Sequence, residues 1–79
     1  MITVRYFAGA REAAGVTTEQ LGGPTSVAAL RAALTAVHPG LADVLPKCAL
    51  LVAGARSTSD DTKVPDDVVI DVLPPFAGG

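Results

Sequence analysis

The 79-residue sequence predicts a single α+β domain in which one main helix packs on one face of a small mixed β-sheet. Three observations support this prediction. Residues 1–8 alternate between the two faces of a strand, as a half-buried strand does, and residues 68–73 form a second run of strand length with Val68, Ile70 and Val72 on one face. Residues 27–37 carry an apolar stripe at helical spacing. A dense apolar run of strand length, residues 47–53, follows the helix.

The N-terminal part of the chain predicts two strands joined by a turn. In residues 1–8, one face of the strand carries Ile2, Val4 and Tyr6, and the other carries Thr3, Arg5 and Phe7. Residues 9–15 begin and end with glycine, which predicts a turn. Residues 17–21 return as a shorter and weaker strand, and Gly22-Gly23-Pro24 ends it.

The central helix has clear signals at both ends. Ser26 is the predicted N-cap, because its hydroxyl oxygen can accept a hydrogen bond from the first turn. His38 is followed by Pro39-Gly40, which predicts that the helix stops there. Residues 41–45 are expected to add a helical turn before Pro46.

The C-terminal half predicts two more strands. Residues 47–53 form the first, ended by Gly54, and residues 55–63 are polar and rich in turn formers. In the last strand, Val68, Ile70 and Val72 share one face. If the first and last strands are parallel neighbours, Phe7 and Leu73 project from the uncovered face of the sheet. Two large apolar side chains there predict a docking surface.

Composition excludes several classes of protein. Apolar residues make up 49% of the chain and charged residues 18%, which is typical of a globular domain and not of a disordered one. The single cysteine excludes an internal disulfide framework and fits a reducing compartment. A net charge of −2 gives no reason to expect nucleic acid as a partner. Neither a signal peptide nor an apolar run of about 18 residues is present, so we expect a soluble cytoplasmic protein without a membrane partner.

The chain ends on Pro74-Pro75-Phe76-Ala77-Gly78-Gly79. Proline fixes its φ angle and cannot donate to a sheet ladder, so the last strand must end there. Two glycines offer the slimmest and most pliant backbone available. We therefore divide the chain into a folded domain, residues 1–75, and a flexible C-terminal tail, residues 76–79. Such a tail can enter a narrow pocket and present its last carboxyl group to another enzyme.

Other reactive side chains have simpler explanations. Cys48 lies in an apolar strand, where free cysteine behaves as a small buried hydrophobe. His38 lies at a helix C-terminus, where a positive charge is mildly favourable. The pairs Asp60-Asp61 and Asp66-Asp67 lie in turn-rich segments and are interpreted as turn formers. The sequence contains no phosphate-binding loop and no metal-ligand spacing, so we expect no metal site.

Several of these residues together resemble a known family. The motifs are Phe7-Ala8 with Arg11-Glu12 and Gly15, then Val27-x-x-Leu30-Arg31, then the Pro-Pro-x-Ala-Gly-Gly ending. They resemble the small subunit of molybdopterin synthase, the MoaD-type branch of the MoaD/ThiS sulfur carriers, over essentially the whole chain. The resemblance implies a ubiquitin-like β-grasp fold.

Three positions depart from the family pattern. Asp66-Asp67 stands where the family typically has Asp-Gly, so the turn before the last strand is expected to differ in shape, because Asp tolerates a positive φ less well than Gly. Gly54 stands where the family often has Asn. Phe76 replaces a smaller residue in the tail. None of these changes touches the reacting atoms.

The resemblance also implies a chemistry for the last residue. An E1-like enzyme uses ATP to adenylate Gly79, and a sulfur donor (a sulfurtransferase) converts it to a thiocarboxylate. That sulfur is donated to a pterin precursor in the large subunit, during molybdenum cofactor biosynthesis. The chain itself is then not an enzyme and binds no cofactor. The resemblance implies that four residues let the tail enter the partner: Gly78, Ala77, Phe76 and Pro75. It implies that three others contact the partner: Phe7, Arg11 and Leu73. Arg11 is equally well explained as a solvated charge paired with Glu12.

Four other functions remain open at this point. One is a ThiS-like carrier for thiazole synthesis, although such chains are typically shorter and lack much of the segment 39–46. A second is a sulfur carrier for cysteine synthesis. A third is a ubiquitin-like modifier joined to lysines through Gly79. The last is a β-grasp interaction module with an inert tail.

Overall fold

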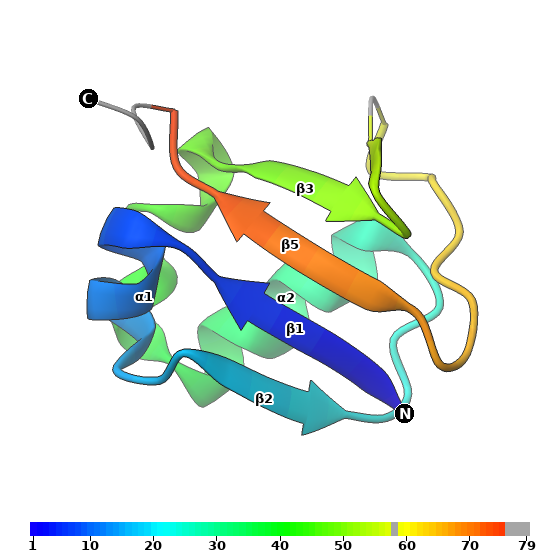
Figure 1. Cartoon of the computed structure of the whole chain (residues 1–79), viewed down its shortest axis with the longest axis horizontal. Coiled ribbons are helices and arrows are strands. Elements are labelled where there is room, and N and C mark those ends of the chain that lie inside the picture. The colour runs from blue at the N-terminus through cyan, green and yellow to red at the C-terminus, as the bar shows by residue number, and fades with distance from the viewer. Residues whose placement is uncertain (58, 76–79) are drawn as a thin grey trace.

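A computed structural model describes residues 1–57 and 59–75, and within these ranges five strands form one mixed sheet with its helices on one face (Figure 1). The elements in chain order are β1 (Ile2–Tyr6), α1 (Ala8–Ala14), β2 (Thr18–Leu21), α2 (Val27–Val37), the 3₁₀ turns η1 (Pro39–Leu41) and η2 (Leu45–Lys47), β3 (Ala49–Val52), β4 (Ala55–Arg56) and β5 (Val69–Leu73). The predicted α+β class is therefore confirmed.

The last strand of the sequence lies in the middle of the sheet. The strand order is β2-β1-β5-β3-β4. β1 and β5 are parallel, with Val4 opposite Ile70, whereas the other neighbouring pairs are antiparallel. The predicted parallel pairing of the first and last strands is confirmed. As a consequence, the chain leaves the sheet from its centre and not from an edge.

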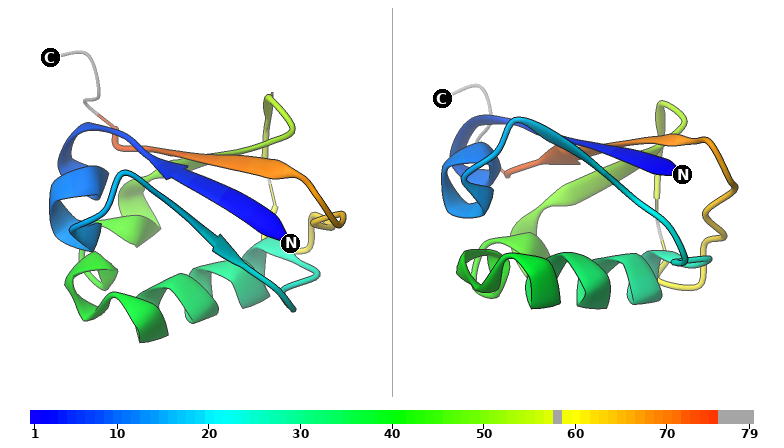
Figure 2. Two further views of the ribbon diagram at one scale, coloured as in Figure 1. Left: turned by 60° about the horizontal axis from the view of Figure 1, so that its bottom comes forward. Right: turned by 90° about the horizontal axis from the view of Figure 1, so that it is seen from below.

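The core fills the space between the sheet and α2. The alternating residues predicted for the core faces of β1 and β5 are all buried: Ile2, Val4, Tyr6, Val68, Ile70 and Val72. α2 adds Val27, Leu30 and Leu34, which are at most 1% exposed. Figure 2 shows α2 beneath the sheet, while the opposite face of the sheet has no helix over it. This uncovered side is the open face of the sheet.

Helix α2 begins and ends where the sequence predicts. The Ser26 hydroxyl oxygen accepts a hydrogen bond from the Ala29 amide at 3.2 Å. At the other end, the His38 amide donates to the Leu34 carbonyl at 2.8 Å, and Pro39 prevents a further turn. Residues 41–45 were predicted to form one helical turn. Instead, Leu41 is the last residue of η1 and Leu45 is the first residue of η2.

The prediction of a turn over residues 9–15 is wrong, because this segment forms the helix α1. Ala10 and Ala14, four residues apart, bury one face of the helix in the core. Gly15 ends it with φ 79°, and its amide donates to the Arg11 carbonyl at 2.9 Å. α1 packs tightly on η1: a Cβ at Gly40 would lie 2.7 Å from the Ala13 carbonyl oxygen.

Two further turns have left-handed residues. Ala53 (φ 52°) and Gly54 (φ 83°) connect β3 to β4, a two-residue strand that the sequence analysis assigned to a turn-rich segment. Two consecutive positive φ values are typical of a type I′ hairpin turn. Asp67, at φ 60°, also adopts the left-handed conformation. Asp67 therefore adopts a positive φ although it is not glycine.

Candidate functional site

The end of β5 positions the base of the predicted tail. β5 ends at Leu73, Pro74 is half-buried and Pro75 is exposed. Figure 1 places this end of the sheet beside α1. The predicted covalent site Gly79 and the tail-access residues Phe76, Ala77 and Gly78 lie outside the described residues. Their predicted roles therefore stay predictions.

Phe7 lies directly beside the end of β5. Its amide donates to the Val72 carbonyl at 3.2 Å, so the chain remains paired to β5 for one residue beyond β1. Its carbonyl accepts the Ala10 amide at 3.0 Å and so caps α1. The following residue, Ala8, has φ 49°, and this left-handed residue redirects the chain from strand to helix. The Phe7 side chain stays 37% exposed, next to the base of the tail.

The two other predicted contact residues lie on either side of this corner. Leu73 pairs with Ala49 of β3 and is half-buried, and the strand alternation places it on the open face. Arg11 is exposed on α1 and forms no ion pair with Glu12. The alternative explanation of Arg11 as a solvated charge is therefore confirmed, but the residue lies in a helix and is not paired with Glu12. The structure brings Phe7 and Leu73 to one corner of the domain, with Arg11 on the adjoining helix.

The open face also holds an ion pair that the sequence analysis missed. Arg5 of β1 lies opposite Asp71 of β5, and its guanidinium donates to both carboxylate oxygens. The hydrogen bond with Asp71, followed by its charge, raises the pKa of Arg5. The same guanidinium lies 5.8 Å from the centre of the Phe7 ring, within the range of a cation–π contact. The sequence signal that could have found this ion pair was the predicted parallel pairing of the first and last strands, because it places Arg5 and Asp71 on the same face.

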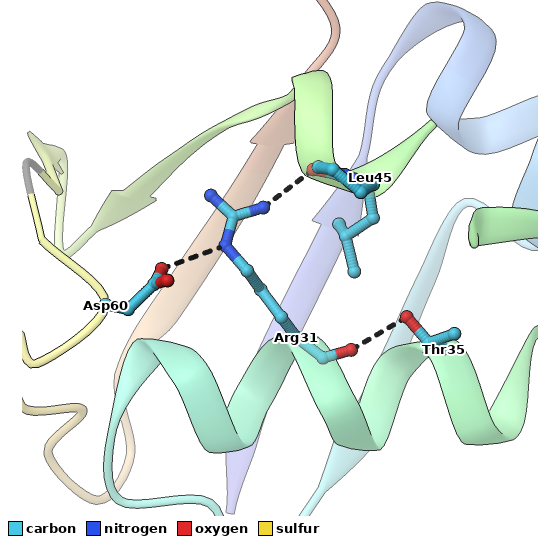
Figure 3. Close-up of a pocket in the computed structure, with 5 residues that line it drawn as sticks. Arg31, Thr35, Leu45 and Asp60 are labelled. Atoms are coloured by element: carbon cyan, nitrogen blue, oxygen red, sulfur yellow. Dashed lines mark hydrogen bonds and ion pairs between the residues drawn. The ribbon is translucent and has the colours of Figure 1, made fainter. Parts of the chain in front are cut away.

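A small groove of about 250 Å³ lies between α2, η2 and the segment before β5 (Figure 3). It is lined by Arg31, Thr35, Leu45, Pro46 and Asp60. The Arg31 guanidinium donates to the carbonyls of Leu45 (2.6 Å) and Cys48 (3.4 Å), and its Nε lies 3.4 Å from an Asp60 carboxylate oxygen. Arg31 therefore ties α2 to the entrance of β3, which is a structural role.

The side chains set aside in the sequence are held in structural contacts. Cys48 is buried, its thiol donates to the Val44 carbonyl at 3.2 Å, and burial raises its pKa, so it remains a protonated thiol. His38 does more than occupy a helix end, because its Nε2 lies 2.8 Å from a Glu19 carboxylate oxygen. The same carboxylate accepts a hydrogen bond from the Tyr6 hydroxyl.

The described residues contain neither a metal-binding cluster nor a membrane-spanning helix. In residues 1–57 and 59–75, no three His, Cys, Asp or Glu side chains gather closely enough to hold a metal ion. Over the same residues, no helix has the length and apolar character needed to cross a membrane.

Comparison with known proteins gives a consistent picture. Residues 4–79 match the ThiS family. Among solved structures, a Pyrococcus furiosus protein assigned as molybdopterin converting factor subunit 1 is 26% identical, with a TM-score of 0.81 and coverage of 94% of this chain and 95% of that chain. Small archaeal modifier protein 1 from Methanosarcina acetivorans is 27% identical, with a TM-score of 0.83 and coverage of 99% and 95%.

A third structure is a complex. It contains subunits 1 and 2 of the molybdopterin-converting factor of Helicobacter pylori, and the matching chain is 27% identical, with a TM-score of 0.76 and coverage of 99% of this chain and 97% of that chain. A search of curated protein sequences found no match. The chain belongs to the ThiS family, and its fold is the ubiquitin-like β-grasp of MoaD/ThiS-type proteins.

Proposed function

We propose that this chain is the sulfur carrier subunit of molybdopterin synthase and that Gly79 carries the sulfur as a thiocarboxylate. The observation that carries the proposal is the family match, which extends to residue 79 and so includes the Gly-Gly ending. The similarity to the molybdopterin converting factor structures supports this branch of the family, and the Helicobacter pylori complex supports a large-subunit partner.

The chemistry requires activation by another enzyme. A carboxylate with the ordinary pKa of about 3.5 is ionised at neutral pH and is a poor acyl donor. An E1-like enzyme therefore joins Gly79 to AMP at the expense of ATP, and a sulfur donor then replaces AMP at the carbonyl carbon. The thiocarboxylate sulfur is the nucleophile that the large subunit delivers to the pterin precursor. The carrier contributes a narrow C-terminal tail that can enter the partner's active site, and it contributes no general base.

Within the proposal, the remaining site residues serve docking and delivery, and the arrangement of this end of the sheet supports those roles. Phe7 and Leu73 form an apolar corner where β5 leaves the sheet, and Arg11 lies on the adjoining helix. A partner that covers this corner can receive the residues that follow Pro75. Within the proposal, Phe76 and Ala77 line up the tail in the partner's channel, and Gly78 lets the end pass.

The test is intact mass spectrometry of the full chain after incubation with ATP, an E1-like enzyme and a sulfur donor. We expect the mass to change by the replacement of one oxygen with sulfur, located at Gly79. The control is the chain without Gly79, which should keep its melting temperature and gain no sulfur. A full chain that is adenylated but never acquires sulfur, or a Gly79 deletion that still transfers sulfur, would contradict the proposal.

A second candidate is a protein modifier, favoured by the similarity to the Methanosarcina acetivorans modifier protein. Both functions start with adenylation of the last glycine and separate at the acceptor, which is sulfur in one case and a lysine amine in the other. Immunoblots of cell extracts distinguish them. A ladder of conjugates that disappears with the Gly79 deletion favours the modifier. Binding to a molybdopterin synthase large subunit, and not to a thiazole synthase, favours the proposed carrier.

A further inference from the structure

The Arg5–Asp71 pair has an unusual place in the molecule. Its two residues lie opposite each other on the parallel strands β1 and β5, on the open face of the sheet. The Asp71 side chain is only 12% exposed although no helix covers this face, whereas the Arg5 side chain is 51% exposed. The carboxylate is thus largely buried on a face without a helix, and the guanidinium contacts both of its oxygens.

The contacts fix the guanidinium from two sides. Arg5 Nε donates to Asp71 Oδ1 at 2.5 Å, and Nη2 donates to Oδ2 at 2.9 Å, which is a bidentate arrangement. The Phe7 ring lies 5.8 Å from the guanidinium carbon. Among the described residues, Arg5 Nη1 forms no hydrogen bond. One edge of the guanidinium is therefore held in place while the Nη1 group remains available.

The surroundings of this group are apolar toward β5 and β3 and polar toward β2, where Thr18 lies opposite Arg5. Val69 is 39% exposed on the same face, and Leu51 and Leu73 are half-buried there. Leu51 lies opposite Asp71 on the other side of β5, so Arg5, Asp71 and Leu51 form one row across the sheet. A fixed arginine that borders an apolar surface is the composition found at energetically important positions of protein interfaces.

We propose that Arg5 is a contact residue for the protein that takes up the C-terminal tail, with Nη1 donating to an oxygen acceptor of that partner, and that Asp71 is the positioning residue that holds Arg5 ready. The inference rests on the proposed function, because the partner is the large subunit that receives Gly79. Asp71 lies on the strand from which the tail departs, two residues before Leu73. A protein that encloses the tail therefore covers this part of the open face.

The physical gain is pre-organisation. A long side chain that must be immobilised on binding loses conformational entropy, and Arg5 has already lost it in the free protein. Lysine at this position would keep the charge but would lose the planar fork that fits both Asp71 oxygens. Asparagine in place of Asp71 would keep the volume but would lose the charge that holds Arg5.

The experiment is titration calorimetry of the full chain with the molybdopterin synthase large subunit of the same organism. We expect Arg5→Lys to weaken binding about tenfold and Asp71→Asn to weaken it several-fold. The control is Lys63→Met, because Lys63 is exposed and its backbone pairs with Ser26 at the start of α2, away from the open face. Its affinity should equal that of the wild type. Thermal melts confirm that each variant is folded at the temperature of the titration.

A double variant separates positioning from a general structural effect. If Asp71 acts through Arg5, Asp71→Asn has no further effect on affinity in an Arg5→Met background. Additive effects of the two substitutions, or an Arg5→Lys affinity within twofold of the wild type, overturn the inference and leave the proposed function intact. A folded wild-type chain that fails to bind the large subunit overturns the proposed function, and this inference with it.

Discussion

Tyr6 has a buried ring in the apolar core and a hydroxyl group that takes part in a polar cluster at the edge of the core. It is 1% exposed, and its hydroxyl donates to the Glu19 carboxylate at 2.5 Å. His38 contacts the same carboxylate and lies edge-on to the Tyr6 ring, with 5.9 Å between the ring centres. One carboxylate of β2 thereby links β1 to the C-terminal end of α2. Among the described residues, no buried side-chain nitrogen or oxygen lacks a hydrogen-bond partner.

This environment predicts a loss of stability in alkali. Burial first, and then the hydrogen bond to Glu19 and its charge, raise the pKa of Tyr6. The unfolded chain loses the phenolic proton at about pH 10, while the folded state keeps it. The unfolded state then binds fewer protons, so the contribution of Tyr6 to stability is complete below about pH 10 and decreases as the pH rises further.

Absorbance of tyrosinate and far-ultraviolet circular dichroism, followed together in an alkaline titration, check this prediction. Tyr6 is the single tyrosine of the chain, so the absorbance reports on one site. We expect tyrosinate to appear only as the circular dichroism signal is lost. Ionisation near pH 10 in a chain that keeps its folded spectrum would show that the hydroxyl is not protected.

At the scale of single residues, sequence patterns predicted the alternation but not the partners. Thr3, Arg5 and Phe7 were expected on the face opposite the core. Arg5 lies on this open face, and the exposed Phe7 follows directly after the end of β1. That Arg5 lies opposite Asp71 depends on the register of β1 and β5. Packing between segments more than 60 residues apart fixes that register, so no local pattern contains it. The contact of His38 with Glu19 was missed because it depends on how the end of α2 packs against β2.

Among the elements, α1 and η1 make the closest backbone approach at a glycine. Methyl substitution at Gly40 would place a Cβ 2.7 Å from the Ala13 carbonyl oxygen, and a backbone atom cannot move aside as a side chain does. We expect Gly40→Ala to lower the free energy of unfolding by about 1–3 kcal/mol.

Gly9 is the matched control for this substitution. It lies within α1, its φ is not left-handed, and a Cβ there would meet nothing within 4 Å. Gly9→Ala should therefore leave stability unchanged or raise it by up to about 1 kcal/mol, because alanine has the higher helix propensity. Denaturant titration of both variants measures the difference. Equal stability of the two variants would mean that α1 and η1 adjust without loss.

The elements differ in how far the sequence defines them. α2 has a capping residue, an apolar stripe and a proline stop, so its bounds were predictable. α1 spans seven residues, which is below the length at which a helix is stable alone, and it forms because Ala10 and Ala14 pack in the core. β4 has two residues and exists only as the partner of β3 across the Ala53-Gly54 turn. Such elements depend on tertiary contacts that sequence periodicity does not record.

The whole molecule is organised around β1 and β5. Each of these strands has a neighbour on both sides, whereas β2 and β4 are edges of the sheet. β4 is held through two register pairs, Leu51 with Arg56 and Val52 with Ala55, and both of its residues are exposed. Regions with few buried contacts open locally at lower free energy than the core does. The stability of the domain is therefore expected to decrease from β5 outward.

Hydrogen exchange of backbone amides, followed by NMR, checks this order. We expect the amides that join β1 to β5 to exchange only through global unfolding, so that their exchange free energy equals that from denaturant titration. The amides of the β3–β4 hairpin should exchange through local opening and much faster. Protection of β4 equal to that of β5 would show that the domain opens as one unit.

The placement of β5 also decides how the domain responds to mechanical load. β1 starts and β5 ends at opposite ends of the sheet, and four register pairs join them in parallel. A force that pulls the C-terminal end of β5 away from the N-terminus acts along these two strands in opposite directions. It therefore loads all the hydrogen bonds between β1 and β5 in shear at the same time, and does not break them one after another. An enzyme that binds the C-terminal end of the chain can thus exert force on it without pulling β5 out of the sheet.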